Sequence, residues 1–235
     1  MINKNKKLYI TYIGIFIIVV CLYLSYNRNN SIEKFNVNKR NLMYACVFHN
    51  KDYIKLLKLL IQSISLKANI NKDTTDILII TSPTFLPIIQ TELSEYDLPL
   101  KYMTLKLNTK MEASCCKLNI YDYENVDLYK RILYLDTDIL INSDINILFN
   151  LNISSNKIYT LEEGTIGEKD VYGSQFFDFT KFNKNTAAFT AGVFYFINSE
   201  QIKKLLDDVR THIDTFIYKD KSINTRYIRS TISSL

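Results

Sequence analysis

The stretch RILYLDTDILIN, residues 131–142, decides how the rest of the chain is interpreted. It begins with an apolar run typical of a buried strand, and Asp136 and Asp138 stand where that strand would end. The spacing alone is a weak signal, because 24 acidic residues among 235 produce roughly two acidic-x-acidic triplets by chance. The apolar flanks carry more weight, since burying two ionised carboxylates costs several kcal/mol unless a cation accompanies them. Hard oxygen ligands suit a Mg²⁺ or Mn²⁺ ion that also holds a diphosphate.

Segments of two kinds alternate around this stretch. Strands are predicted for the short apolar runs at residues 42–48, 76–81, 100–107, 131–136, 157–162 and 191–198. Helices are predicted for residues 50–68, for segments starting near Thr84 and near Ala113, and for a segment after Asn198 or Ser199. The last helix should have one apolar face, made of Ile202, Leu205, Leu206, Val209 and Ile213. This alternation predicts an α/β fold, a largely parallel sheet with helices on both sides.

The position of the acidic pair then has a functional meaning. In open α/β sheets, ligands bind beyond the carboxyl ends of the strands. If residues 131–135 form a central strand, Asp136 and Asp138 lie at that end of the sheet. The same pattern, an apolar strand followed by D-x-D, also resembles phosphatases of the haloacid-dehalogenase type. In those enzymes the motif lies on the first strand of the domain, whereas about 90 residues of apparent α/β sequence precede it here, which makes this the weaker alternative.

The N-terminus predicts a membrane anchor. Residues 8–27 carry no charge, and twenty residues at about 1.5 Å each span roughly 30 Å, the thickness of the hydrocarbon core. Lysines precede this run, so residues 1–7 are expected to form a cytoplasmic tail of a single-pass type II protein. A cleaved signal peptide is the alternative, but no clear cleavage site follows the run. Residues 28–41 read as a stem, with the soluble part facing the ER/Golgi lumen in a eukaryotic cell, where Asn152 lies in a glycosylation sequon.

Composition excludes several classes of protein. A hydrophobic fraction of 47% supports a packed core and argues against general disorder. The net charge of +5 is mild and the basic residues are scattered, so no nucleic acid is expected as a partner. The cysteines form neither a zinc spacing nor a disulfide framework, and the adjacent Cys115 and Cys116 are interpreted as small buried residues.

Four segments in order resemble glycosyltransferase family 8, the glycogenin-like nucleotide-sugar transferases. The segments are YACVFHNKDYIKLLKLLIQSI from residue 44, CKLNIYDY with YKRILYLDTDILINSDINILF between residues 116 and 149, IYTLEEG from residue 158, and FTAGVFYFIN from residue 189. The resemblance covers roughly residues 43–218. It implies a single Rossmann-like GT-A domain with a mixed, mostly parallel sheet over residues 42–218, followed by an irregular C-terminal tail, 219–235. It also implies transfer of a hexose from a nucleotide sugar, UDP-linked, to a glycan, protein or lipid acceptor in a metal-dependent, retaining reaction.

The resemblance also assigns roles to individual residues. Asp136 and Asp138 would hold Mn²⁺ (or Mg²⁺) on the donor diphosphate, and Asp138 and Lys117 would take part in catalysis. Lys117 would lie near the donor sugar and diphosphate. The remaining donor-binding residues would be Val47, Asn50 and Tyr53 around the nucleoside, with Thr190, Ala191 and Gly192 beside the transferred sugar.

Most of these residues also have an ordinary structural interpretation. Lys117 fits a helix-surface lysine, and Tyr53 fits a core aromatic residue. Asn50 fits a cap of the helix that begins near residue 51. Gly192 fits a sheet position where two chain segments approach closely. Sequence alone leaves both interpretations of these four residues open.

The chain departs from the family pattern in three places. Thr190 stands where the family usually has Asn, and the later DQ-containing motif is only echoed by DKSIN at residues 220–224. The C-terminal His-x-x-Gly-x-x-Lys-Pro-Trp motif, which supplies a third metal ligand in the family, is absent. The two histidines, His49 and His212, do not match it, and His212 is interpreted as a flanking helix residue. An inactive or truncated relative that binds nucleotide sugars or a partner is therefore the alternative function.

Overall fold

The computed structural model describes residues 39–168 and 178–219, with side chains described as far as residue 213. The predicted anchor at residues 8–27 and the tail after residue 219 lie outside these ranges. No helix among the described residues is long and apolar enough to span a bilayer. The elements below belong to the compact unit that begins at Arg40.

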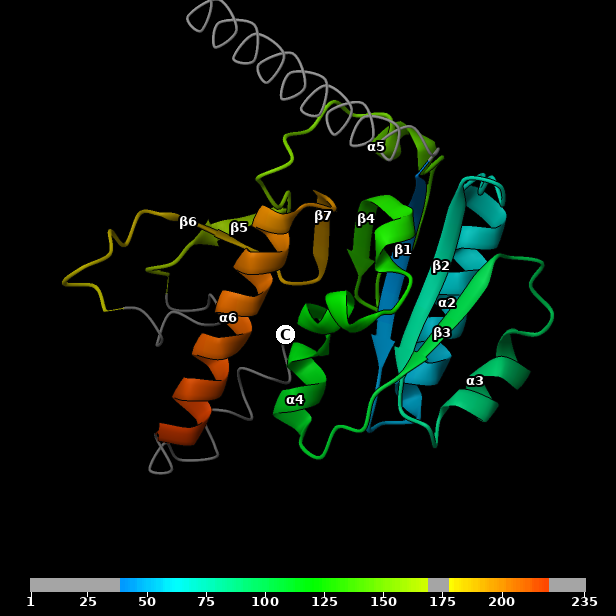
Figure 1. Cartoon of the computed structure of the whole chain (residues 1–235), viewed down its shortest axis with the longest axis horizontal. Helices are drawn as coiled ribbons and strands as arrows, with labels where there is room; N and C mark the ends of the chain where they lie inside the picture. Colours follow the sequence, from blue (N-terminus) through cyan, green and yellow to red (C-terminus); the bar gives the residue numbers. More distant parts are fainter. Residues whose placement is uncertain (1–38, 169–177, 220–235) are drawn as a thin grey trace, which may run out of the picture. The chain divides into compact units, whose positions relative to one another are not determined.

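The chain alternates strands and helices as predicted (Figure 1). The strands are β1 (Arg40–Val47), β2 (Thr75–Thr81), β3 (Leu100–Thr104), β4 (Tyr129–Leu135), β5 (Glu162–Thr165), β6 (Ala187–Phe189) and β7 (Val193–Ile197). The α-helices are α2 (Asp52–Lys67), α3 (Leu86–Leu93), α4 (Lys110–Cys115), α5 (Asn146–Phe149) and α6 (Glu200–Lys219). Two 3₁₀ helices, η1 (Cys116–Asp122) and η2 (Val126–Leu128), lead into β4.

The main sheet is mixed and mostly parallel, in the order β3-β2-β1-β4-β7. Neighbouring strands from β3 to β4 are parallel, and β7 alone in this sheet runs antiparallel, paired with β4. The strand order reverses between β1 and β4, because β2 and β3 lie to one side of β1 and the later strands to the other. β5 and β6 form a separate two-stranded antiparallel sheet.

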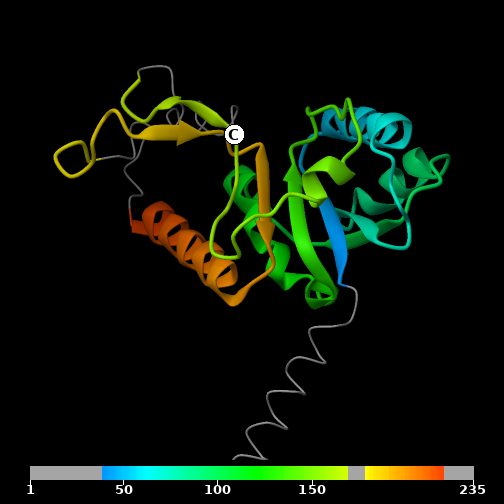
Figure 2. The same cartoon turned by 90° about the horizontal axis from the view of Figure 1, so that it is seen from above.

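Each face of the main sheet packs against its own layer (Figure 2). Alternate residues of one strand point to opposite faces, so Met43 and Ala45 of β1 join α2 and α3 in one core, while Leu42 and Tyr44 join η1 and α6 in the other. Helix α2 buries five apolar side chains, Ile54, Leu57, Leu60, Ile61 and Ile64, in the first core. The predicted α/β layering is therefore confirmed.

Four predicted elements differ from the structure. The expected strand at residues 157–162 is wrong over most of its length: only Tyr159 pairs with β7, through Tyr195, and the chain then leaves for β5. The strand expected at residues 100–107 ends at Thr104. On α6, Ile202 and Leu206 are buried, but Leu205 and Val209 are 43% and 39% exposed, so the apolar face is narrower than predicted.

The helix expected near Ala113 begins earlier, at Lys110. The reason is a capping box: the Thr109 side chain accepts from the Glu112 N–H, and the Glu112 carboxylate accepts from the Thr109 N–H. The helix continues only to Cys115 before the chain tightens into η1. This tightening determines where Lys117 lies.

Candidate functional site

The carboxyl ends of β1 and β4 define the candidate site. These strands are adjacent and parallel, and the sheet order reverses between them. Such a switch point opens a crevice at the carboxyl ends, where α/β proteins bind ligands. Val47 is the last residue of β1, and Asp136 directly follows β4. The sequence-based position of the acidic pair, at the end of a central strand, is confirmed.

The acidic pair lies on a turn that closes this strand. The Asp136 carbonyl accepts a hydrogen bond from the Ile139 N–H at 3.2 Å, and the Asp136 N–H donates to the Gly192 carbonyl at 2.8 Å. Thr137 between the two aspartates is buried, whereas Asp138 is exposed. The turn therefore fixes the backbone of Asp136 against the segment that enters β7, and it directs Asp138 to solvent.

Lys117 reaches the same point from η1. Its side chain is only 7% exposed, so the interpretation as a surface lysine is wrong. The Nζ donates to the Ala191 carbonyl at 2.9 Å and lies 3.6 Å from Oδ1 of Asp136. The Lys117 carbonyl accepts from the hydroxyl of Tyr44 at 2.8 Å, so both ends of this residue are held.

Tyr134 is a site residue that the sequence interpretation missed. Its hydroxyl donates to Oδ1 of Asp136, and its ring centroid lies 4.9 Å from the Nζ of Lys117. Burial raises the pKa of the Tyr134 hydroxyl well above 10, with Cys46 and Asp136 adding to the shift, so the hydroxyl keeps its proton. The period of two along a strand places Tyr134 and Asp136 on one face, which is the signal that could have revealed it.

The FTAG segment forms the opposite wall of the site. The Thr190 hydroxyl accepts from the Gly192 N–H at 3.2 Å, and the Thr190 carbonyl accepts from the Thr160 hydroxyl at 2.7 Å. A Cβ on Gly192 would lie 3.2 Å from Oδ2 of Asp136, which confirms Gly192 as a position of close approach. Ala191 and Gly192 thus contact Lys117 and Asp136 through their carbonyls, and Thr190 lies directly before them.

The loop after β1 lies at the same end of the sheet but makes its own local contacts. Val47 is buried, and its carbonyl accepts from the Thr81 hydroxyl at 2.7 Å. The Asn50 Oδ1 accepts from the Asp52 N–H at 3.0 Å, which holds the turn that leads into α2, but the N-cap position is Lys51 and it has no side-chain cap. Tyr53 is 45% exposed, and the core interpretation is wrong for it. No hydrogen bond among the described residues joins Asn50 or Tyr53 to Asp136.

Within residues 39–168 and 178–213, the histidines and cysteines do not complete a metal cluster. His49 has φ 59°, and its Nε2 lies 2.9 Å from the Thr109 carbonyl, which ties the loop after β1 to the start of α4. His212 is exposed on α6 and contacts the Asp208 carbonyl, which fits a flanking helix residue. Burial raises the pKa of the Cys116 thiol well above its usual range, and Cys115 is half-buried.

The acidic pair nevertheless fits a hard divalent cation. Across the described ranges, no three His, Cys, Asp or Glu side chains gather into a metal-binding group. Mg²⁺-type sites, however, need only one or two carboxylates, because substrate phosphates and water complete the shell. Asp138 has no hydrogen-bonded partner among these residues, and the missing side chain of Gly192 leaves room beside Oδ2 of Asp136.

Comparison with known families decides which proteins this arrangement belongs to. The model of the family described as Glycosyl transferase family 8 matches residues 30–213, most of the chain. The chain belongs to glycosyltransferase family 8. No curated protein sequence matches it.

Several solved structures are similar in fold to this family 8 chain. It superposes on galactosyltransferase LgtC, crystallised with donor and acceptor sugar analogues, with a TM-score of 0.54, 14% identity, and coverage of 77% of this chain and 65% of that one. For the bifunctional glycosyltransferase WbbM the TM-score is 0.50 at 13% identity, covering 74% and 33%. For mouse xyloside xylosyltransferase 1 the TM-score is 0.48 at 13% identity, covering 71% and 72%. The family 8 chain described here spans about two thirds of LgtC and a third of WbbM. The likeness to LgtC supports the predicted GT-A-like fold.

Proposed function

We propose that this chain is a glycosyltransferase that moves a hexose from a nucleotide sugar, UDP-linked, to an acceptor in a divalent-metal-dependent, retaining reaction. The observation that carries the proposal is the convergence of Lys117, Asp136 and Gly192 at the switch point of a family 8 domain. A buried cation beside a carboxylate, at the place where α/β sheets bind ligands, suits a substrate that carries a diphosphate.

Asp136 and Asp138 are the residues that would hold the metal, Mn²⁺ or Mg²⁺. When bound, the ion would act as a Lewis acid that neutralises charge on the diphosphate leaving group. The carboxylates offer hard oxygen ligands, which this class of cation prefers. Exposure of Asp138 gives the ion a route from solvent, and the backbone hydrogen bond between Asp136 and Gly192 keeps the first carboxylate in place.

Lys117 supplies the second positive charge. Its ammonium group is already desolvated and fixed by Ala191, so little reorganisation is required when negative charge develops on the leaving group. In the absence of substrate it balances Asp136 across 3.6 Å. Asp138 and Lys117 are thus the residues proposed to act in catalysis.

The remaining donor contacts divide between two walls of the site. Val47, Asn50 and Tyr53 follow one another from the end of β1 into α2, and we assign them to the nucleoside. Thr190, Ala191 and Gly192 are assigned to the transferred hexose. Thr190 uses one lone pair of its hydroxyl oxygen to accept from Gly192, so its O–H donor and its second lone pair remain for a sugar.

Placement in the cell is part of the same proposal. Residues 8–27 would anchor the protein in a bilayer as a single-pass type II protein, with residues 1–7 in the cytoplasm and 28–41 as a stem. The transferase domain would span 42–218 and face the ER/Golgi lumen in a eukaryotic cell, with 219–235 as a tail. The acceptor, whether glycan, protein or lipid, would meet the domain on that side.

A second candidate is binding without turnover. The absence of a third acidic, His or Cys ligand near Asp136 and Asp138 among the described residues favours weak metal binding. The phosphatase alternative finds less support, because three strands precede β4 in the chain. Replacing Asp136 by Asn would remove the nucleophile of a phosphatase, whereas in a transferase it would remove dependence on Mn²⁺.

One set of measurements tests the proposal. The full chain in detergent is heated with UDP, GDP and Mn²⁺, singly and in pairs, and its release of UDP from UDP-hexoses is followed. Stabilisation that requires UDP and Mn²⁺ together, with turnover, supports the transferase. The same stabilisation without turnover supports the binding-only candidate, and stabilisation by neither compound rejects both. Lys117→Met should reduce turnover, and Lys101→Met, an exposed lysine on β3, serves as its control.

A further inference from the structure

Tyr134 connects the two charged groups of the site. Among the described residues, it is the only one whose side chain both hydrogen-bonds to Asp136 and places its ring beside the ammonium of Lys117. A tyrosine buried this deeply normally satisfies its hydroxyl with any available acceptor. Here the acceptor is one oxygen of a carboxylate that we assign to the metal.

The ring of Tyr134 has little freedom to move. Its centroid lies 4.9 Å from that of Tyr44 and 5.8 Å from that of Phe194, one neighbour on each adjacent strand. Tyr134 is 2% exposed and lies in the core formed with η1 and α6. The hydroxyl is therefore held at one place relative to the end of β4.

This arrangement separates the roles of the two carboxylate oxygens. Oδ1 of Asp136 accepts from Tyr134 and faces the Lys117 ammonium. Oδ2 lies on the side of Gly192, which has no side chain of its own, and the Thr190 hydroxyl borders the same space. Without the Tyr134 hydroxyl, the carboxylate could rotate about its last bond and bring either oxygen towards Lys117.

We propose that Tyr134 is a positioning residue that fixes the carboxylate of Asp136, keeping Oδ1 engaged with the protein and presenting Oδ2 to a divalent cation. The inference rests on the proposed function of the site. Tyr134 does not touch the cation, and it acts through Asp136. The Lys117 ammonium also lies over the face of the Tyr134 ring, and this cation–π contact keeps the ammonium within reach of the diphosphate.

The chain offers a matched control on the same strand. Tyr129, at the other end of β4, is equally buried, and its hydroxyl donates to the carboxylate of Asp76 at 3.0 Å. Tyr129→Phe and Tyr134→Phe each remove one hydroxyl and one tyrosine–carboxylate hydrogen bond. A purely structural role predicts the same result for both variants.

The test measures binding of Mn²⁺ by electron paramagnetic resonance in the presence of UDP, together with urea unfolding without metal. Tyr134→Phe should weaken Mn²⁺ binding by about tenfold or more, the fold-change expected when a carboxylate loses a hydrogen bond. Tyr129→Phe should leave Mn²⁺ affinity unchanged, and both variants should lose similar resistance to urea. Equal Mn²⁺ affinity in Tyr134→Phe and the wild type overturns the inference and leaves the proposed function intact.

Two further outcomes are decisive. If the wild type does not bind Mn²⁺ with UDP, the proposed function and this inference fall together. If Tyr134→Phe does not fold, Phe194→Leu replaces it, because this change loosens the packing of the Tyr134 ring without touching Asp136. Phe194→Leu should weaken Mn²⁺ binding about threefold, less than direct loss of the hydrogen bond, and an unchanged affinity overturns the inference.

Discussion

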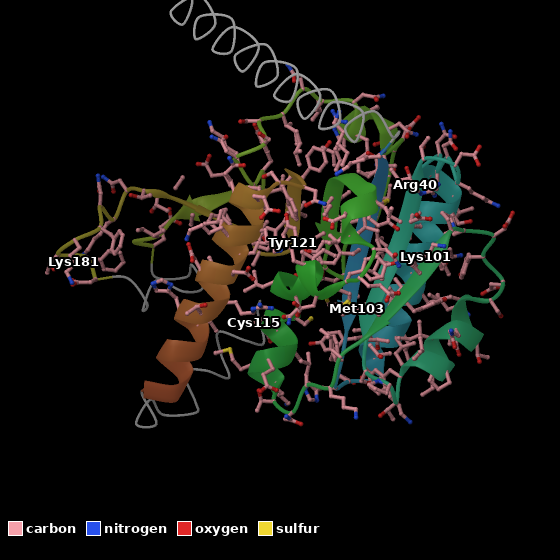
Figure 3. The ribbon with its side chains drawn as sticks, in the orientation of Figure 1. Arg40, Lys101, Met103, Cys115, Tyr121 and Lys181 are labelled. Carbon is pink, nitrogen blue, oxygen red and sulfur yellow. The ribbon has the colours of Figure 1, made fainter. Side chains whose placement is uncertain are left out.

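Each end of β4 brings together a tyrosine, a carboxylate and a basic side chain. Only at the amino end is the basic side chain hydrogen-bonded to the carboxylate. At the amino end, Asp76 accepts from both Arg40 Nε and Nη2, at 2.7 and 2.9 Å, and from the Tyr129 hydroxyl at 3.0 Å. At the carboxyl end, Asp136 accepts from Tyr134, and Lys117 stays 3.6 Å away. Figure 3 labels Arg40 at the amino end of β1, and Cys115, two residues before Lys117, further towards the carboxyl end.

The difference teaches how a structural ion pair differs from a site. The Asp76 side chain is 7% exposed and bidentate to arginine, so its charge is fully matched within the protein. The Asp136 side chain is 27% exposed, and the Lys117 ammonium is bonded to a carbonyl instead of to the carboxylate. The first arrangement stabilises the fold, whereas the second keeps a carboxylate and an ammonium available to a ligand.

Replacing Asp136 by Asn should have the largest effect on turnover and should not have a counterpart at the amino end of β4. The loss of a charged metal ligand should lower UDP-hexose turnover on the order of 10²–10³-fold. Resistance to urea should fall less than in Asp76→Asn, because Asp136 is 27% exposed and Lys117 keeps its bond to Ala191. Asp76→Asn is the matched control at the other end of β4, and it should lose stability while its folded fraction keeps turnover. Undiminished turnover in Asp136→Asn would contradict the assignment of the site.

Replacing Arg40 by Met tests the amino end. It leaves the Asp76 carboxylate buried with Tyr129 as its side-chain donor. Removing one partner of a buried pair costs about 3–5 kcal/mol. Because Arg40 is partly exposed, the expected loss of unfolding free energy is at the lower limit, about 3 kcal/mol. The measurement is the free energy of unfolding in urea. A loss below about 1 kcal/mol would show that this pair behaves as an ordinary surface salt bridge.

Gly192→Ala should sharpen the difference at the carboxyl end. The new Cβ would lie 3.2 Å from Oδ2 of Asp136 and 3.4 Å from the Thr190 hydroxyl oxygen. Crowding of this kind costs about 1–3 kcal/mol, so Mn²⁺ binding in the presence of UDP should weaken by roughly tenfold. Calorimetric titration measures this affinity. If it does not change, the space beside Gly192 is not used by the ion.

Alkaline pH should reduce the stability contributed by the two ends of β4 in the same way. Burial raises the pKa of Tyr129 and of Tyr134 above 10, and the neighbouring carboxylates add to the shift. The folded protein then keeps protons that the unfolded chain releases, so this stability is complete below about pH 10 and falls as the pH rises further. Each such tyrosine contributes about 1.4 kcal/mol per pH unit to the fall. Between about pH 9 and 11, the free energy of unfolding of Tyr129→Phe should fall by about 1 kcal/mol less than that of the wild type. Parallel curves of unfolding free energy against pH would contradict the assignment.

Much of the fold follows from short-range pattern. The unbroken apolar runs predict β1, β2 and β4, and the 3.6-residue period predicts α2, because these patterns reflect which faces must be buried. The strand expected at residues 157–162 fails for a long-range reason. Its first residues pair with β7 only at Tyr159, and the carbonyl of Leu161 accepts from the Thr190 N–H. No local pattern shows which edge a short apolar segment will join.

The site divides in the same way. Asp136 and Asp138 could be placed from sequence, since a strand end is a local feature. The burial of Lys117 could not, because it depends on Tyr44 from an earlier strand and Ala191 from a much later loop. The two-residue strand period could have placed Tyr134 on the same face as Asp136. A tyrosine in an apolar run is, however, interpreted as a core residue until its hydrogen-bond partner is known.

The hydrogen bond between the Asp136 N–H and the Gly192 carbonyl has a further consequence. It joins the exit from β4 to the entry into β7, so the long segment between them leaves and returns at one point. Such a segment can change in length or composition while its two ends, and the carboxylate held there, stay in register. Exposed positions of this segment can therefore vary, and with them the acceptor preference proposed above, while the carboxylate at the end of β4 stays in place.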